Sequence, residues 1–268
     1  MIPKVIHYCW FGGNPLPELA LKCIESWKKY CPDYEIIEWN EKNFDININK
    51  YCKQAYECGK WAFVSDVARL YALVNIGGIY MDTDVEVIKP IDDFLCCEAF
   101  SGFESEIYIP TGIMAAEKGQ PFFEELLSSY NNISFVDENG NMDLTTNVVK
   151  ITEASEKYGF VPNNQKQTVA GLVLYPKDYF CPKNNKTGVI EITDNTHTIH
   201  HFSGSWHTED RVYFSELQKN FYRAFKIKIS SIIIDVICEI VTTIKFFGFK
   251  KLVDKGVEFV KRGFKFKE

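Results

Sequence analysis

The sequence lacks the cysteine spacing of a disulfide or redox framework. None of its nine cysteines forms a C-x-x-C pair, and Cys96 and Cys97 are adjacent. No secretory signal is recognisable ahead of the cysteines. We therefore expect reduced, mostly buried thiols in a cytoplasmic protein.

Long uninterrupted hydrophobic runs are missing as well. The most apolar stretch, at residues 229–249, is interrupted by Asp235 and Glu239. It falls short of the ~18 uninterrupted apolar residues that a membrane-spanning helix needs, so we expect it not to cross a membrane. The chain also contains no internal repeat and no low-complexity tract.

Positive charge is scarce outside the C-terminal part. The formal net charge is -6, but residues 219–268 carry 12 Lys+Arg against 5 Asp+Glu, which leaves -13 for residues 1–218. An acidic body is a poor general binder of nucleic acid, whereas a basic segment can meet an anionic surface. The sequence thus predicts a body of residues 1–218 and a basic amphipathic helical tail of residues 219–268. The tail suits a lipid surface, packing against the body, or packing against a second copy in a homo-oligomer.

What the chain does have is enough apolar material for a large core, with 46% hydrophobic and 15% aromatic residues. Strand-like and helix-like patterns alternate along the first ninety residues. Strands are expected near residues 3–11, 34–39 and 79–88, and helices near 17–30 and 61–75. This alternation predicts an α/β fold with a largely parallel sheet, whose ligands bind at the carboxyl ends of the strands.

Two carboxylates, Asp82 and Asp84, stand in the segment GGIYMDTDVEVIKP. In an extended strand alternate residues share a face, so both would project to the same side. Oxygen ligands of this kind suit Mg²⁺ or Mn²⁺. An isolated Asp-x-Asp is also compatible with a solvated turn, so the surrounding sequence must decide.

Three blocks stand in order around this pair: IHYCWFGG, FVSDVARLYALVNIGGIYMDTDVEVIKP and HHFSGSW. Together they resemble the nucleotide-sugar glycosyltransferases with a DXD sugar-binding region. These are the bacterial capsule and lipopolysaccharide enzymes related to the yeast initiating α-1,6-mannosyltransferase, and more distantly the large clostridial glucosylating toxins. The resemblance covers residues 1–90 well and residues 197–207 moderately.

The resemblance implies a GT-A type fold, a Rossmann-like mixed sheet flanked by helices, with the C-terminal helices as an appendage. It also implies a retaining, metal-dependent hexosyltransferase that uses Mn²⁺ or Mg²⁺ and a nucleotide sugar. A UDP-sugar is expected as donor from the toxin relatives, and GDP-mannose stays open through the mannosyltransferase branch. The expected acceptor is a glycan or lipid-linked oligosaccharide of capsule, lipopolysaccharide or exopolysaccharide synthesis. The basic, Phe-rich tail favours a lipid-linked glycan at the cytoplasmic membrane face, and a soluble capsule-type or protein acceptor stays open.

Site residues follow from the same resemblance. Trp10 takes the place of the Trp that stacks on the nucleobase, although a core aromatic is the competing interpretation. Asp66 and Arg69 match the pair that holds sugar hydroxyls, and a plain intrahelical ion pair is the alternative. Tyr80 matches the Tyr that approaches the ribose. Asp82 matches a ribose and metal contact, and Asp84 matches the direct metal ligand.

The late block completes the expected site. Alignment on Trp206, whose counterpart contacts the donor phosphate, puts His201 where the toxins use a carboxylate metal ligand. Imidazole is an acceptable ligand for Mn²⁺, so His201 is the expected third ligand. His200 competes for this role, and adjacent residues of a strand face opposite ways, so only one of the two should serve. Ser205 is a further candidate for the phosphate.

Two interpretations from other classes stay open. A metal-dependent phosphohydrolase also uses an Asp-x-Asp pair, usually after the first strand and not the third. A non-catalytic module that binds a sugar nucleotide or glycan would need fewer polar groups than are present. For retention itself, same-face attack is favoured, because no carboxylate in the sequence can be assigned beneath the anomeric carbon.

Overall fold

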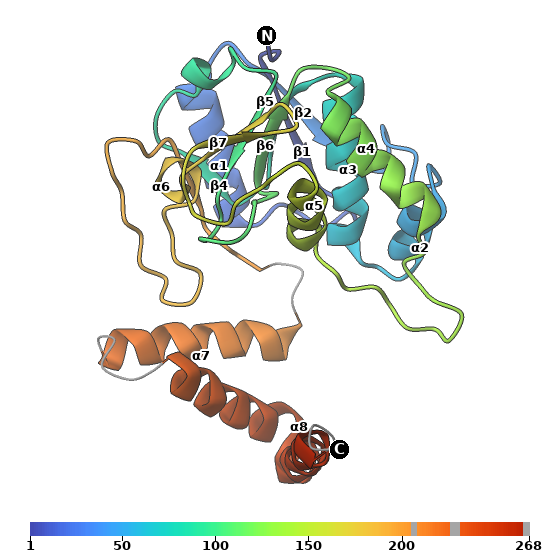
Figure 1. Ribbon diagram of the computed structural model, residues 1–268, viewed down its shortest axis with the longest axis vertical. Helices are drawn as coiled ribbons and strands as arrows, with labels where there is room; N and C mark the ends of the chain where they lie inside the picture. Colours follow the sequence, from blue (N-terminus) through green and yellow to red (C-terminus); the bar gives the residue numbers. More distant parts are fainter. Residues whose placement is uncertain (205–207, 226–230, 265–268) are drawn as a thin grey trace. The chain divides into compact units, whose positions relative to one another are not determined.

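The computed structural model describes residues 1–204, 208–225 and 231–264. The chain divides into two compact units (Figure 1). The first comprises Met1–Lys183 and Ile190–Ser203, and the second comprises Asn184–Val189 and Gly204–Glu268. The boundary predicted after residue 218 falls inside helix α7 (Glu209–Phe225).

A seven-stranded sheet forms the centre of the first unit, in the order β2-β1-β3-β6-β5-β8-β7. Strand β1 runs parallel to β2 and β3, and β5 runs parallel to β8, whereas β6 is antiparallel to β3 and β5, and β7 is antiparallel to β8. The α/β class and the mixed sheet are confirmed, but the expectation of a largely parallel sheet is wrong, because half of the strand pairings are antiparallel. The strands are β1 (Val5–Cys9), β2 (Glu35–Trp39), β3 (Gly78–Met81), β5 (Ala99–Gly102), β6 (Ile113–Ala116), β7 (Gln167–Val169) and β8 (Leu172–Tyr175).

Helices cover both faces of this sheet (Figure 1). Alternation along β3 separates the two layers: Ile79 and Met81 pack into the cluster that contains helix α1, while Tyr80 packs into the cluster that contains helix α3. The helices of this unit are α1 (Glu18–Tyr30), α2 (Lys50–Glu57), α3 (Trp61–Asn75), α4 (Pro121–Ser129), α5 (Asn147–Glu156) and α6 (Lys177–Phe180), with short 3₁₀ turns at Asp92–Phe94 and Tyr130–Asn132.

Helix α1 shows how the sequence pattern selects the buried face. Ala20, Cys23, Ile24 and Trp27 recur at helical spacing and are buried. The Trp27 indole Nε1 also donates to the Val85 carbonyl (2.7 Å), which ties the helix to the segment after the carboxylate pair. Helix α3 follows its predicted bounds, because its apolar run is ended by two glycines.

The segment that carries the carboxylate pair is not the single strand that its sequence suggested. Strand β3 ends at Met81, and residues 82–84 form a turn closed by a hydrogen bond from Val85 N to Asp82 O (2.9 Å). Strand β4 (Val85–Val87) then joins a separate two-stranded sheet with β9 (Thr198–His200). The expectation that Asp82 and Asp84 alternate along one extended strand is therefore wrong.

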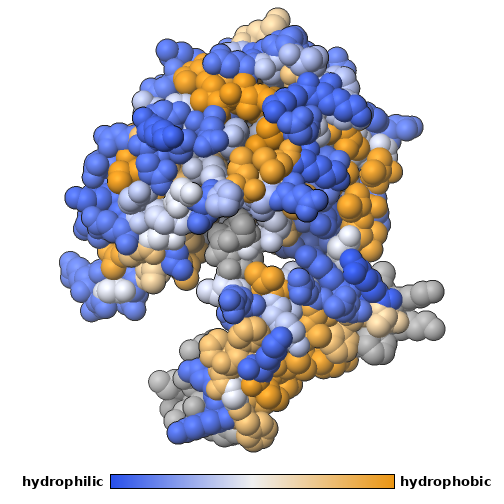
Figure 2. All heavy atoms as spheres, turned by 180° about the vertical axis from the view of Figure 1, so that it is seen from behind, coloured by the Kyte–Doolittle hydropathy of each residue, from blue (hydrophilic) through white to orange (hydrophobic). Residues whose placement is uncertain are grey.

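The second unit contains helix α7 and helix α8 (Ser231–Phe264), which is interrupted at Gly248, where φ is 79°. Tyr222, Ile234 and Cys238 form its small buried core. Within the described residues, no helix is long and apolar enough to span a bilayer. Figure 2 shows hydrophobic side chains gathered on these C-terminal helices.

The turn into β3 generates a stability prediction. Gly78 has φ 109°, and a Cβ there would lie 2.6 Å from the Val5 carbonyl oxygen, so Gly78→Ala adds a backbone clash to backbone strain. We expect a loss of roughly 3 kcal/mol or more in the free energy of unfolding, measured by denaturant titration. Gly13→Ala is the matched control, since Gly13 also has a positive φ (67°) but no atom within 4 Å of the added Cβ. That control should lose about 1 kcal/mol, and equal losses would refute the clash.

Candidate functional site

The site lies at one edge of the central sheet. Strand β3 is parallel to β1 and antiparallel to β6, and β5 is also antiparallel to β6, so β1, β3 and β5 all run in the same direction. Their carboxyl ends therefore meet at one edge, where open α/β sheets bind ligands. Trp10 is the first residue after β1, and Asp82 is the first residue after β3.

Three potential ligands converge there. Single ligand atoms of Asp82, Asp84 and His200 all lie within 4.8 Å of one another. Pairing of β4 with β9, which sets Val85 opposite His200, brings the imidazole to the turn that carries the carboxylates. This is how residues more than a hundred positions apart in the sequence come to share one site.

Gly112 leaves the space that this cluster occupies. Its carbonyl accepts a hydrogen bond from Asp82 N (2.8 Å). A Cβ at this position would lie 3.0 Å from the His200 ring and 3.4 Å from Asp82 Oδ2. A larger residue would therefore press on both groups. The sequence analysis did not identify Gly112, whose only signal is its place before a short apolar run.

Asp84 is held as an ionised carboxylate. Burial alone would raise its pKa, but the facing His200 and the backbone of Ser203 outweigh burial, and the pKa lies well below its usual range. His200 Nε2 lies 3.3 Å from Asp84 Oδ1, and Ser203 N donates to Asp84 Oδ2 (2.7 Å). Burial lowers the His200 pKa, but Asp84 raises it by more, so the pKa lies well above its ordinary value.

The remaining faces of the His200 ring are also held. Nδ1 lies 3.8 Å from Cys181 Sγ, and the Phe202 ring packs against the imidazole with centroids 4.1 Å apart. These contacts fix the ring so that Nε2 points toward Asp84.

The structure places His200, and not the expected His201, beside the carboxylates. His201 turns the other way, and its Nε2 lies 2.8 Å from Glu86 Oε2. The two neighbours face opposite directions, as expected for adjacent residues at a strand end, and the strand register selects the first of them. By this geometry His200, and not His201, is the candidate third ligand.

Arg69 connects the carboxylate turn to helix α3. Its Nη2 lies 3.2 Å from Asp66 Oδ1, and its Nη1 lies 3.2 Å from Asp82 Oδ1. Nη1 also donates to the Thr111 carbonyl (2.8 Å). The intrahelical ion pair considered from the sequence is therefore present, and it extends to the DXD turn. Burial raises the pKa of Asp66 to about 6, although Arg69 opposes the shift.

Tyr80 supports this arrangement from below. Its ring is buried, its hydroxyl donates to Asp82 Oδ1 (2.8 Å), and the Arg69 guanidinium lies over the ring at 4.5 Å from the centroid. The structure thus shows Tyr80 as a partner of Asp82 and Arg69.

The other predicted residues have different surroundings. The Trp10 indole is half-buried, packs against the α1 side of the core and donates from Nε1 to Asn14 O (2.6 Å). Ser205 and Trp206 lie outside the described residues.

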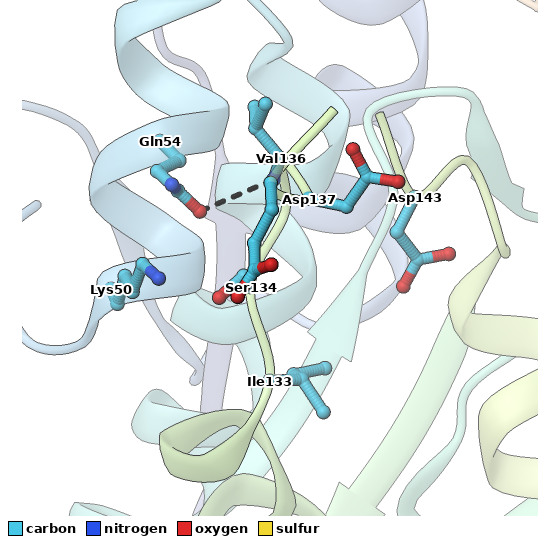
Figure 3. Close-up of a pocket in the computed structure, with 8 residues that line it drawn as sticks. Lys50, Gln54, Ile133, Ser134, Val136, Asp137 and Asp143 are labelled. Carbon is cyan, nitrogen blue, oxygen red and sulfur yellow. Dashed lines mark hydrogen bonds between the residues drawn. The ribbon is translucent and has the colours of Figure 1, made fainter. Parts of the chain in front are cut away.

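A separate hollow of about 530 Å³ lies between α2 and the segment of residues 133–143 (Figure 3). Lys50 and Gln54 contribute from the helix, and Gln54 Oε1 accepts from the backbone nitrogens of Phe135 (3.0 Å) and Val136 (3.2 Å). None of the predicted donor-site residues that the structure describes lines this hollow.

The converging groups fit a divalent cation. Two carboxylate oxygens and one imidazole nitrogen are a donor set that Mn²⁺ accepts, and Mg²⁺ shares the carboxylate preference. Ligand atoms at about 2.1 Å from one ion are at most about 4.2 Å apart, so small side-chain rotations would bring atoms now within 4.8 Å onto it.

Comparisons with known proteins find glycosyltransferases. Residues 17–101 match the family model described as a glycosyltransferase sugar-binding region containing a DXD motif. Inositol phosphoceramide mannosyltransferase 3 of Schizosaccharomyces pombe is 28% identical over 142 residues, which are 50% of this chain and 38% of that protein. Mannosyl phosphorylinositol ceramide synthase CSH1 of Saccharomyces cerevisiae is 25% identical over 234 residues, which are 82% of this chain and 57% of that protein. Among solved structures, the PaToxG glycosyltransferase is similar at a TM-score of 0.46 and 19% identity, over 58% of this chain and 68% of that chain.

The first unit is an α/β unit with a mixed sheet, helices on both faces and paired carboxylates at the carboxyl edge of the sheet. Residues 17–101 match the glycosyltransferase sugar-binding region with a DXD motif, and this match confirms the resemblance seen in the sequence. It spans about two fifths to three fifths of the length of the two curated relatives named above.

The two adjacent histidines offer a matched test of the cluster. His200→Ala removes the imidazole that lies with Asp82 and Asp84, so the dissociation constant for Mn²⁺ should rise about 10-fold or more. His201→Ala removes the ring that contacts Glu86, and the dissociation constant for Mn²⁺ should stay within about twofold of the parent value. Titration of Mn²⁺ followed by electron paramagnetic resonance of the free ion measures both. A larger loss in His201→Ala than in His200→Ala would contradict the assignment.

Proposed function

We propose that this protein transfers a hexose from a nucleotide sugar to a glycan acceptor, with retention of the anomeric configuration and with Mn²⁺ or Mg²⁺ as cofactor. The observation that carries the proposal is the convergence of Asp82, Asp84 and His200 at the carboxyl edge of the sheet. Both carboxylates belong to the region that matches the family model. A second carboxylate pair or a nucleophile is not needed for this chemistry when the leaving diphosphate itself accepts the proton of the acceptor.

Asp82, Asp84 and His200 would hold the cation. When bound, a divalent cation neutralises the negative charge that develops on a departing diphosphate. Arg69 and Tyr80 keep Asp82 in place, because both contact its Oδ1. The backbone of Ser203 does the same for Asp84 Oδ2.

The donor is held by residues around this cluster. We assign the nucleobase to the half-buried Trp10 indole at the end of β1, the ribose to Asp82 with Tyr80 behind it, and the sugar hydroxyls to Asp66 and Arg69. Ser205 and Trp206 would contact the diphosphate, as the family resemblance implies. Asp66 and Arg69 lie in contact with each other and, through Arg69, with Asp82, so the sugar and cation sites share one network.

Mannose is the hexose favoured by the relatives, whose names describe mannosyl transfer. A UDP-sugar is favoured by the resemblance to the glucosylating toxins. The two nucleotides are therefore the first ligands to compare.

Calorimetric titration of UDP and of GDP, with and without Mn²⁺, tests the donor site. We expect one of them to bind only with Mn²⁺, and Asp84→Asn to weaken this binding about 100-fold or more, because changes to outer partners of a metal ligand alone cost about 10- to 100-fold. The exposed Asp93 gives the control variant Asp93→Asn, which should bind like the parent.

Several outcomes would count against the proposed function. Absence of nucleotide binding in the parent protein would refute it. Release of free phosphate from a phosphomonoester would indicate a phosphohydrolase, and nucleotide binding without turnover of any nucleotide sugar would indicate a binding module. Full turnover with the metal chelated would refute the cation site.

We also propose that the acceptor is presented at a cytoplasmic membrane surface, where the C-terminal helices bind without spanning it. Helix α8 exposes apolar side chains, including Ile232 (72%), Phe247 (54%) and Phe249 (67%), and Lys250 and Lys251 are exposed beside them. Apolar insertion combined with basic charge is the pattern of helices that lie on anionic lipid surfaces. The relatives named for ceramide lipids support a lipid-linked acceptor.

Replacement of both exposed lysines tests this surface. The double variant Lys250→Gln and Lys251→Gln should bind vesicles of phosphatidylcholine and phosphatidylglycerol on the order of 30-fold more weakly, at about 1 kcal/mol per charge. Co-sedimentation with the vesicles measures this affinity. The control pair Lys42→Gln and Lys53→Gln removes two exposed lysines from the other unit and should leave binding unchanged. Equal binding by all variants, together with a doubled mass in light scattering, would indicate that this face packs against a second copy.

A further inference from the structure

A third carboxylate reaches the edge that carries the DXD turn. Glu104 is the second residue after β5, as Asp82 is the first after β3. Because β3 and β5 are both antiparallel to β6, they run in the same direction and end at the same edge. The sheet topology therefore brings Glu104 to the side of the molecule where the cation and sugar sites lie.

The loop that carries Glu104 is anchored at both ends. Glu104 N donates to Tyr108 O (2.9 Å), and Phe103 N donates to Tyr175 O (2.9 Å). Ser101 Oγ donates to Ile113 O (2.8 Å), at the start of the strand that follows Gly112. Glu104 thus leaves a fixed strand end on the same loop that supplies Gly112 to the cluster.

The Glu104 carboxyl interacts electrostatically with all three members of the cluster. Burial raises its pKa, His200 lowers it, and the negative charges of Asp82 and Asp84 raise it further. Throughout the part of the chain that the structure describes, its side chain forms no hydrogen bond or ion pair. The side chain is partly exposed at the edge of the sheet, and an ionised carboxylate offers about four lone-pair sites to hydrogen-bond donors of a bound molecule.

The chemistry of a nucleotide sugar indicates which of its groups would donate hydrogen bonds to Glu104. A diphosphate is anionic and is repelled by a third carboxylate, whereas a hexose ring is neutral and carries several hydroxyl donors. We propose that Glu104 accepts hydrogen bonds from hydroxyl groups of the transferred hexose, which makes it a substrate-contacting residue of the donor site. This assignment rests on the proposed function and adds a residue that no sequence motif marks.

The test separates binding of the sugar from binding of the nucleotide. Glu104→Gln keeps the side-chain size and removes the charge. Calorimetry with Mn²⁺ compares UDP with UDP-glucose and GDP with GDP-mannose, using the pair whose nucleotide the parent binds. We expect the nucleoside diphosphate to bind within about twofold of the parent and the nucleotide sugar to bind about 10-fold more weakly or worse, because hydrogen bonds to a charged group are lost. Glu106→Gln changes an exposed carboxylate on the same loop and should alter neither.

Other outcomes would overturn the assignment. Equal weakening of nucleotide and nucleotide sugar would show that Glu104 supports the cation or the fold, and unchanged binding of both would show no contact. Lost turnover with unchanged nucleotide-sugar binding would place Glu104 at the reacting bond or the acceptor. If the parent binds neither nucleotide, the proposed function fails first and Glu104 fails with it. Should Glu104→Gln not fold, Glu104→Asp, which keeps the charge but shortens the side chain, is measured with the same expectations.

Discussion

Negative charge crowded at one edge of the sheet is the constraint that shapes the rest of the site. Arg69 is buried between two carboxylates, 3.2 Å from both Asp66 and Asp82, and His200 faces Asp84 at 3.3 Å. Removing one partner from such a group leaves an uncompensated buried charge, which typically costs about 3–5 kcal/mol. Arg69 and His200 do not neutralise all of this negative charge. A divalent cation would neutralise the remainder, so the same carboxylates that must be stabilised in the fold would also bind the cation.

Pairing between strands far apart in the sequence brings these charged groups together. The chain leaves the central sheet after Met81, turns at the carboxylate pair and enters the small β4-β9 sheet. In that sheet His200 pairs with Val85. Gly112, on the loop before β6, leaves the gap into which the imidazole and Asp82 fit. One turn, one strand pairing and one missing side chain therefore assemble groups from three distant parts of the sequence.

The two units have opposite electrostatic character, which suits different tasks. The acidic body carries the carboxylates Asp82 and Asp84, where a cation would bind, and the basic C-terminal helices expose hydrophobic side chains, including Phe247 and Phe249. Under the proposed function, one unit carries out the transfer and the other brings it to the surface where the acceptor is found.

The sequence by itself determined the local elements and the local part of the site. Helix α3 could be placed at Trp61–Asn75 because its apolar run ends at two glycines, and the Asp82–Asp84 pair and its family resemblance are read from contiguous residues. Only the tertiary structure decided that half of the strand pairings are antiparallel, that His200 and not His201 lies beside the carboxylates, and that Glu104 follows a strand ending at the same edge. The physical reason is that strand direction and register depend on pairings between segments far apart in the chain, and a shift of one residue exchanges the two faces of a strand.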